Sequence, residues 1–316
     1  MMLHTMAGQA AGQRFCWLAL AFAVSLVWYA PSPAAAAPRI AVSIPPIHSL
    51  VASVTAGVSV PTLIVRGSAS PHGYAMAPSD ARAVQQADLV VWVGPDLETF
   101  LARALRDPRP GQRVITLMTA EEIKVLAART GGVSDDHGHQ DREGADAHLW
   151  LDPANARAIV TLTVSALSAI DPTNAATYRA NGDQTRARLD ALDTALVHQF
   201  AAVKDRPFIV FHDAYQYLER RYGLTVAGAI TVSPDRKPGA RRLREIQTRI
   251  ADPGVACVFA EPQVKPDVIE TVIAGTAARA AVTDLLGADL TPGPDLYFVL
   301  MTNLAKALVD CLIEGS

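Results

Sequence analysis

Short strand-like runs alternate with amphipathic helical stretches along most of the chain. The strand-like runs fall at 39–44, 60–65, 89–93, 114–117, 208–211, 255–260 and 280–282. The helical stretches fall at 47–55, 79–87, 96–105, 214–222, 241–250, 266–278 and 296–313. Ser79 is expected to cap the helix that follows it, and Gly223 to end the helix before it. This alternation, present in both halves, predicts an α/β fold with mainly parallel sheets.

The longest helical pattern runs from 173 to 204. Its larger side chains recur mostly three, four or seven residues apart, at Tyr178, Thr185, Leu189, Leu192, Leu196, Phe200 and Val203. At 1.5 Å per residue such a helix is on the order of 40 Å long, enough to run along two domains. We therefore expect an N-terminal α/β domain at 38–172, a connecting helix at 173–204 and a C-terminal α/β domain at 205–316. Gly182 costs about 1 kcal/mol relative to Ala inside a helix, so a bend there is an alternative.

The first 37 residues (1–37) have the composition of a secretory signal peptide. Arg14 is their only charged side chain, the run 16–30 is almost wholly apolar, and PSPAAAAP supplies small residues for cleavage near Ala37. An uncleaved anchor is the alternative, but about 15 apolar residues are fewer than the roughly 20 that span a bilayer. The mature chain is therefore expected to be exported, with no later segment inserted in the membrane.

Charge and cysteine content narrow the class of protein. The sequence has 28 Lys and Arg against 31 Asp and Glu, and loss of Arg14 leaves a net charge of about −4. No nucleic-acid partner is expected, because such partners require a basic surface. Cys16 leaves with the signal, while Cys257 and Cys311 form an even pair that suits an oxidising compartment. We expect these two to be bonded, which would tie the last helix to a core strand; two buried free thiols are the alternative.

Three histidines lie at or after the ends of predicted strands, where ligands collect in parallel α/β folds. His72 lies in RGSASPHGYAMAPSD, His148 in DAHLWLDP, and His212 closes PFIVFH. Neutral imidazoles suit Zn²⁺, and three of them leave one tetrahedral position to fill. Because imidazoles coordinate only when neutral, zinc affinity is expected to fall as the pH drops through about 6.5.

The sequences around these histidines resemble an ordered set of family motifs. PHGYxxxPSD, HLWLDP, FHDAYxYL, FAEPQ and VTDLLG are similar, in that order, to the motifs of the periplasmic zinc-uptake solute-binding proteins, which belong to the metal-specific class that serves ABC transporters. The resemblance covers essentially the whole mature chain. It implies two α/β domains joined by a long helix, with the metal in the cleft between them.

The resemblance also implies roles for individual residues. His72 and His148 match the family's zinc ligands from the N-terminal domain, and His212 matches the ligand from the C-terminal domain. Asp284 matches a carboxylate that is a ligand in some members and a near neighbour in others. The resemblance further pairs the cysteines, because Cys257 and Cys311 match a disulfide found in close relatives.

Three positions bear on the identity of the metal and its fourth ligand. Manganese-binding relatives carry a carboxylate where this chain has His212, and three imidazoles favour zinc over the harder ion. Some relatives have a glutamate before the first histidine, where this chain has Pro71, so the fourth position falls to Asp284 or to water. The acidic loop 131–146 holds only His137 and His139, which are interpreted either as a weak accessory metal site or as incidental residues of a solvated linker.

Five further residues have structural explanations that involve no metal ion. Asp80 and Asp213 could orient imidazoles, but helix capping is the favoured interpretation. Tyr217 is expected to pack in the core, as is its neighbour Tyr215. Glu261 in FAEPQ is expected to form a structural turn.

The resulting hypothesis is a monomeric periplasmic protein that captures Zn²⁺ and delivers it to a membrane ABC permease. A manganese-binding homologue of the same class is the first alternative. A secreted zinc hydrolase is a second, although neither HExxH nor GxSxG occurs. A surface adhesin is a third. The chain is expected not to be an enzyme.

Overall fold

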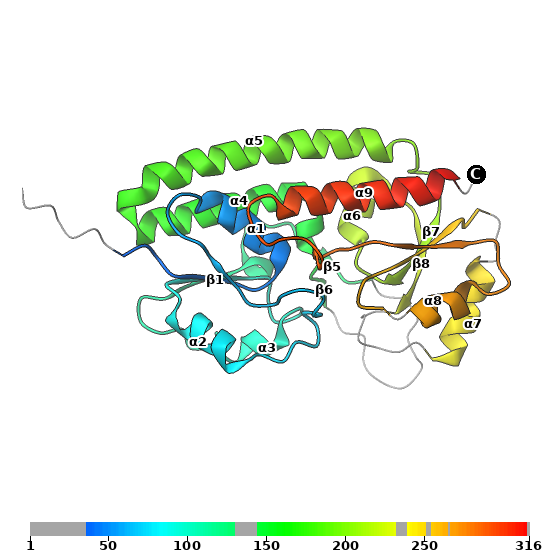
Figure 1. Cartoon of the computed structure of the whole chain (residues 1–316), viewed down its shortest axis with the longest axis horizontal. Coiled ribbons are helices and arrows are strands. Elements are labelled where there is room, and N and C mark those ends of the chain that lie inside the picture. Colours follow the sequence, from blue (N-terminus) through cyan, green and yellow to red (C-terminus); the bar gives the residue numbers. More distant parts are fainter. Residues whose placement is uncertain (1–35, 130–143, 232–238, 251–253, 265, 315–316) are drawn as a thin grey trace, which may run out of the picture. The chain divides into compact units, whose positions relative to one another are not determined.

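The N-terminal half is built on one sheet of four short parallel strands. The structure is a computed structural model that describes residues 36–129, 144–231, 239–250, 254–264 and 266–314. The sheet has the order β2-β1-β3-β4, with β1 at Ile40–Val42, β2 at Thr62–Leu63, β3 at Leu89–Trp92 and β4 at Arg113–Thr116 (Figure 1). Nearly all of the predicted signal segment falls outside the described residues.

Helices cover both faces of this sheet, because its strands are apolar on both sides. Side chains of odd and even positions enter different clusters: Val42 packs toward α1 (Pro45–Val54), whereas Ala41 packs toward α2 (Pro78–Gln86) and α3 (Thr99–Ala102). Burial on both faces is what a parallel sheet requires.

The C-terminal half repeats this plan with a second parallel sheet. Its order is β10-β9-β7-β8, with β7 at Phe208–His212, β8 at Val226–Thr231, β9 at Cys257–Ala260 and β10 at Arg279–Val282. Helices α6 (Gln216–Tyr222), α7 (Ala240–Ile250) and α8 (Pro266–Ile273) follow β7, β8 and β9 in turn. The predicted fold class, with mainly parallel sheets, is confirmed.

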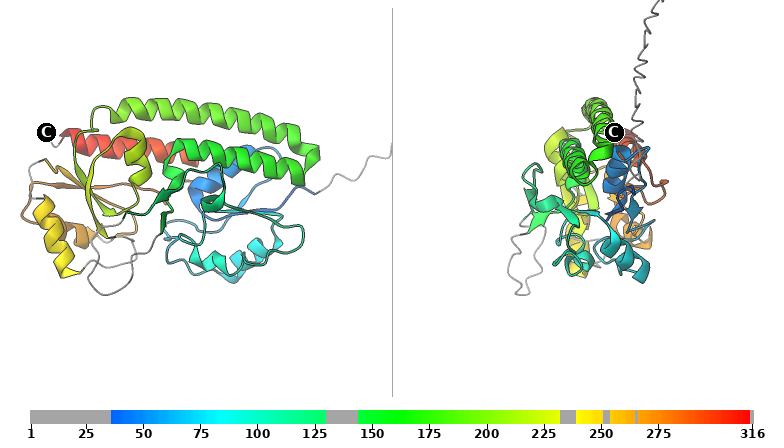
Figure 2. Two further views of the ribbon diagram at one scale, coloured as in Figure 1. Left: turned by 180° about the vertical axis from the view of Figure 1, so that it is seen from behind. Right: turned by 90° about the vertical axis from the view of Figure 1, so that its left-hand side faces the viewer.

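Three long helices lie together on one side of the molecule. They are α4 (Pro153–Ile170), α5 (Ala175–Phe200) and α9 (Leu296–Glu314); α5 packs on both of the others, as the two views in Figures 1 and 2 also show. The expected long helix is therefore present, shorter than predicted by two residues at its start and four at its end. The predicted division into domains at 172 and 204 stays a prediction.

Gly182 serves close packing inside α5. A Cβ atom built on it would lie 2.5 Å from Cγ2 of Val164 on α4, which is closer than two carbon atoms can approach. Helix α5 is continuous through this position. The glycine therefore allows the two helices to approach, and the bend considered from the sequence is not needed to explain it.

One hydrophobic cluster runs through both halves. It contains Val42 and Val91 from the first sheet, Phe208 and Phe259 from the second, and buried residues of α4, α5 and α9. Helix α9 contributes Leu300, Met301, Leu304, Ala305, Leu308 and Leu312, all of them at most 1% exposed. The two sheets therefore share a core under the long helices.

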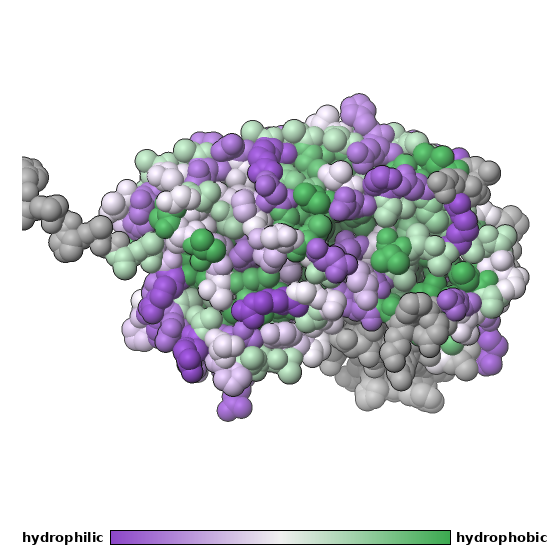
Figure 3. All heavy atoms as spheres, viewed as in Figure 1, coloured by the Kyte–Doolittle hydropathy of each residue, from purple (hydrophilic) through white to green (hydrophobic). Residues whose placement is uncertain are grey.

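Helix α9 is long and apolar enough to cross a bilayer by length and composition alone, over the window Leu296–Ile313. Half of that window is buried inside the molecule. The face seen in Figure 3 also mixes hydrophilic and hydrophobic residues instead of presenting one apolar band. The packing thus explains the apolar composition of α9 as that of a core helix.

The disulfide between Cys257 and Cys311 is present, and the prediction of a bonded pair is confirmed. Cys257 begins β9 and Cys311 lies near the end of α9, with their Cα atoms 6.3 Å apart. The bond therefore ties α9 to a central strand of the second sheet.

A few boundaries differ from those predicted. Helix α2 begins at Pro78 with Ala77 at the N-cap, so the prediction of Ser79 as the cap is wrong. Helix α6 ends at Gly223, which adopts a left-handed φ of 69°, as predicted. Two short strands that were not predicted, β5 (Leu126–Ala127) and β6 (Ala145–Asp146), form an antiparallel hairpin.

Candidate metal site

Three histidines from three separate segments meet at one point. His72 lies in the loop between β2 and α2, His148 two residues after β6, and His212 is the last residue of β7. One nitrogen from each ring lies within 4.8 Å of the other two. In the described part of the chain, these three are the grouping of histidine, cysteine and carboxylate side chains that could hold a metal ion.

The spacing of two of these nitrogens fits a metal ion. Nε2 of His148 and Nε2 of His212 are 3.2 Å apart. Two nitrogens bound to one tetrahedral zinc at 2.0 to 2.1 Å lie about 3.3 Å apart. The two nitrogens are therefore spaced as two ligands of one zinc ion would be.

The space beside the rings is small. It is a cavity of about 20 Å³ lined by the three histidines together with Ser70, Pro71, Trp150, Glu261, Gln263, Leu285 and Leu286. A volume of about 10 to 15 Å³ holds one water molecule. The cavity thus suits a single ion, and it offers little room for an organic substrate.

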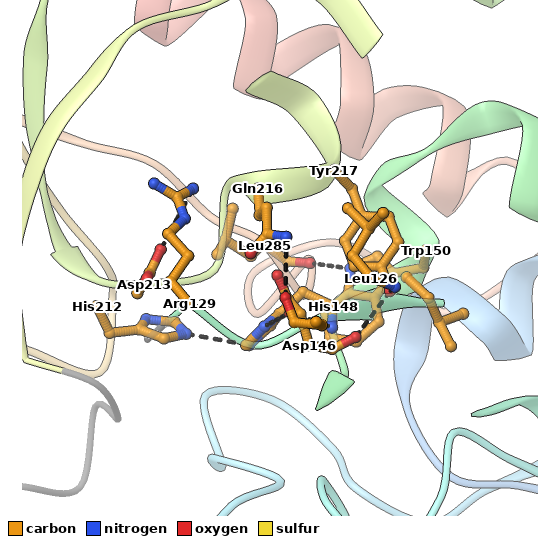
Figure 4. A network of polar contacts seen from close by, with 12 residues as sticks. Leu126, Arg129, Asp146, His148, Trp150, His212, Asp213, Gln216, Tyr217 and Leu285 are labelled. Atoms are coloured by element: carbon orange, nitrogen blue, oxygen red, sulfur yellow. Dashed lines mark hydrogen bonds and ion pairs between the residues drawn. The ribbon is translucent and has the colours of Figure 1, made fainter. Parts of the chain in front are cut away.

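Two buried carboxylates orient two of the rings. Asp146 Oδ1 lies 2.8 Å from Nδ1 of His148 and also accepts the backbone N–H of His148 at 2.9 Å, as Figure 4 shows. Glu261 Oε1 lies 2.6 Å from Nδ1 of His212. With the Nδ1 proton donated to a carboxylate, each ring presents the lone pair of Nε2 to the cavity.

Glu261 forms the turn predicted from the sequence and also contacts His212. The turn is present, because the backbone N–H of Val264 donates to the Glu261 carbonyl at 2.9 Å. The side chain, however, is 4% exposed and directed at His212. Asp146 was not predicted at all, although its position two residues before His148, in Asp-Ala-His, was a visible signal.

The two aspartates expected to cap helices behave differently. Asp80 accepts the backbone N–H of Ala77 at 3.2 Å, which confirms a capping role at α2. Asp213 does not cap α6: the N-cap there is Tyr215, without a side-chain hydrogen bond. Its Oδ1 instead lies 3.5 Å from the guanidinium of Arg129.

Asp284 lies outside the cluster of three histidines. Both carboxylate oxygens of Asp284 accept backbone N–H groups of the turn that follows it, from Leu286, Gly287 and Ala288. The structure does not bring this side chain into the group of ligand atoms. His137 and His139 fall in 130–143, outside the described residues.

The surroundings of His72 lower its pKa, which favours the neutral imidazole that a metal ion requires. Burial, with the nearby rings of His148 and His212, lowers the pKa of His72 to about 3. Above pH 3 the His72 ring is neutral, so protons do not compete with a metal ion for its nitrogen between pH 5.5 and 7.5.

The lowered pKa of His72 predicts a shallower pH dependence of zinc affinity than three ordinary imidazoles would give. Titrations with Zn²⁺ at a series of pH values between 5.5 and 7.5 are expected to show log affinity rising with pH by at most about two units per pH unit. A slope close to three would contradict a neutral His72.

Removing the charge of Glu261 is expected to weaken metal binding. Glu261→Gln keeps the size of the side chain but loses the carboxylate that supports His212, a change that typically costs about 10- to 100-fold in metal affinity. The affinity is measured by competition with a chelator of known strength. Glu219→Gln, which alters a carboxylate paired with Arg129, is the matched control, and equal affinities in the two variants would refute the assignment.

These features define a class: an α/β protein of two parallel sheets with a histidine cluster suited to one divalent metal ion. The family model described as "Zinc-uptake complex component A periplasmic" matches residues 40–311. The chain therefore belongs to this family of periplasmic zinc-uptake components, as its motifs predicted. The family is one of transport components and not of enzymes.

Individual relatives agree with this assignment. The high-affinity zinc uptake system protein ZnuA of Brucella abortus (strain 2308) is 40% identical over 304 residues, covering 86% of this chain and 91% of that protein. The ZnuA of Yersinia pestis is 31% identical over 314 residues, covering 94% and 98%. A crystal structure of ZnuA superposes with a TM-score of 0.74 at 25% identity, covering 89% of this chain and all of that one.

Other solved structures share the fold alone. A laminin-binding protein of Streptococcus agalactiae, described as having adhesin and metal-transporting activity, has a TM-score of 0.74 at 24% identity, covering 87% of this chain and 99% of that one. A Pseudomonas aeruginosa solute-binding protein in complex with Mn²⁺ has the same score at 20% identity, covering 88% and 99%. The fold therefore does not select the metal, which depends on the ligands.

Proposed function

We propose that this chain binds one Zn²⁺ ion through His72, His148 and His212 in the periplasm and delivers it to a membrane ABC permease. The observation that carries the proposal is the convergence of three imidazole nitrogens within 4.8 Å of one another. Family membership supports zinc as the cargo and transport as the task. We propose that the chain acts as a monomer.

The chemistry of the ligands favours zinc over manganese. Imidazole is a borderline-soft ligand that suits zinc, whereas manganese prefers carboxylate and other oxygen ligands. At position 212 this chain has an imidazole, whereas a carboxylate at that position would suit manganese, the harder ion. The two outer carboxylates also supply two negative charges near a doubly charged ion.

The fourth ligand is proposed to be Asp284 or water. Oδ2 of Asp284 accepts one hydrogen bond, from Ala288 at 2.6 Å, so one of its lone pairs stays available. Coordination by Asp284 would need this side chain to move toward the histidines, since it lies outside their group. Loss of zinc affinity in Asp284→Ala would support the carboxylate, and unchanged affinity would support water.

The proposal is tested by calorimetric titration of the metal-free mature protein. We expect one Zn²⁺ per chain, bound more tightly than Mn²⁺. Tighter binding of Mn²⁺ would favour the manganese alternative. Hydrolysis of an ester or peptide substrate by the zinc-loaded protein would favour the hydrolase, which the small cavity of about 20 Å³ opposes.

A further inference from the structure

We propose that Tyr217 is a positioning residue for metal binding, which sets His148 against His212 through a hydrogen bond to the hairpin of β5 and β6. The inference rests on the proposed function, because it concerns the same histidines. Tyr217 lies on α6 in the C-terminal half, while the hairpin belongs to the N-terminal half. Its side chain is only 2% exposed.

The hydroxyl of Tyr217 joins the two strands of the hairpin. It accepts the backbone N–H of Leu126 at 3.1 Å and donates to the backbone carbonyl of Asp146 at 2.7 Å (Figure 4). Leu126 and Asp146 are register partners in the antiparallel pair. One buried oxygen thus satisfies a donor and an acceptor at the end of the hairpin, and it fixes where Asp146 lies.

The position of Asp146 in turn determines the position of His148. Its Oδ1 contacts both the backbone N–H and Nδ1 of His148, at 2.9 and 2.8 Å. The backbone and the ring of His148 are therefore both held by the residue whose carbonyl Tyr217 binds. A shift of the Asp146 backbone would move the Nε2 atom that faces the cavity.

His212, the proposed ligand from the C-terminal half, is connected to Tyr217 by a short stretch of backbone. His212 and Tyr217 are five residues apart, and the backbone between them is held by the bond from Ala214 N–H to the His212 carbonyl at 3.0 Å. Tyr215, fully buried, contributes a second anchor through its hydroxyl, 2.6 Å from the Thr283 hydroxyl. Tyr217 therefore links the His212 segment to the His148 segment by a short and buried route.

Two other links between the hairpin and α6 lie nearer the solvent. Gln216 Nε2 donates to the Ala127 carbonyl at 3.0 Å, and the Arg129 guanidinium pairs with Glu219; both contacts are exposed. Exposed polar pairs contribute little, typically below about 1 kcal/mol. The buried hydroxyl is the link on which the spacing of the histidines should depend most.

A cavity of about 360 Å³ adjoins Tyr217 and is lined also by Lys124, Leu126, Asp152 and Arg221, among others. Space on this side allows the end of the hairpin to move when the hydroxyl is removed. The expected result of Tyr217→Phe is therefore a displaced His148 in a folded protein, because the ring itself stays packed.

The test compares Tyr217→Phe with wild type and with the control Tyr178→Phe. Tyr178, on helix α5, is also buried, and its replacement removes one hydroxyl hydrogen bond, to the side chain of Asp171. We expect zinc affinity to fall about 10-fold in Tyr217→Phe alone, the lower end of the cost of losing an outer partner of a metal ligand. The visible absorption bands of the Co²⁺-loaded protein should also change in this variant, which a loss of stability alone would not cause.

Two outcomes separate the possibilities. Wild-type affinity and an unchanged Co²⁺ spectrum in Tyr217→Phe would overturn the positioning role while leaving the proposed function intact. Failure of the wild type to bind zinc would overturn the proposed function itself. If Tyr217→Phe does not fold, hydrogen exchange on the wild type decides: zinc should slow exchange of the Leu126 amide, and an unchanged rate would refute the coupling.

Discussion

Replacing His148 by alanine is expected to weaken zinc binding by more than about 100-fold, beyond the range caused by losing an outer hydrogen-bond partner. The substitution removes one of three imidazole nitrogens and leaves Asp146 without the Nδ1 group that it holds at 2.8 Å. His72→Ala and His212→Ala are expected to have effects of the same order. The affinity is measured by competition with a chelator, at a pH where all variants are folded.

The control is a histidine that the structure keeps away from the cluster. His198→Ala changes an exposed position of α5 and should leave affinity unchanged. The double variant His137→Ala with His139→Ala should lose far less affinity than His148→Ala, because these residues are proposed as at most a weak accessory site. A His148→Ala variant that binds zinc as tightly as wild type would exclude this histidine as a ligand.

Loss of the disulfide is expected to lower the free energy of unfolding by about 4 kcal/mol. The bond closes a loop whose ends are 54 residues apart, so it removes much of the freedom of the unfolded C-terminal half. The double variant Cys257→Ala with Cys311→Ala would then unfold at a lower urea concentration than wild type. Urea denaturation of both proteins, followed by circular dichroism, measures the difference.

Adding a reductant to the wild type and to the double variant provides the control for this experiment. It should shift the midpoint of the wild type toward that of the variant, and leave the variant unchanged. If complete reduction, shown by two titratable thiols per chain, leaves the wild-type midpoint where it was, the stabilising role of the bond is wrong.

Much of the fold could be predicted because its strongest signals are local. Apolar strands and periodic helices gave the alternation, and the spacing of large residues gave α5. Helix α4 escaped notice because PANARAIVTLTVSALSAI is rich in small and β-branched residues, so its helical period is weak. Strand β8 contains Gly228, which lowers strand propensity, and β5 and β6 have two residues each.

The site was predictable to the extent that its residues stand in recognisable motifs. His72, His148 and His212 were found in this way, and the structure brings them together. For Glu261 the sequence predicts only a turn, and for Tyr217 only core packing, because what these side chains contact depends on tertiary structure. Glu261 lies 49 residues from His212 in the chain, and Tyr217 lies 71 from Asp146. No local sequence pattern predicts a contact between residues so far apart in the chain.

The hydrophobic cluster shared by both sheets has a consequence for how the protein responds to its cargo. With Val42, Phe259 and the inner face of α9 in one cluster, the two halves should unfold in a single cooperative step. A ligand that binds only the folded form stabilises it by about 4 kcal/mol when present at 1,000 times its dissociation constant. In a chain with one cooperative core, that free energy protects every segment and not only the residues beside the ion. Loaded chains should therefore outlast empty ones wherever periplasmic proteases remove unfolded protein, so that the supply of metal also sets the abundance of its carrier.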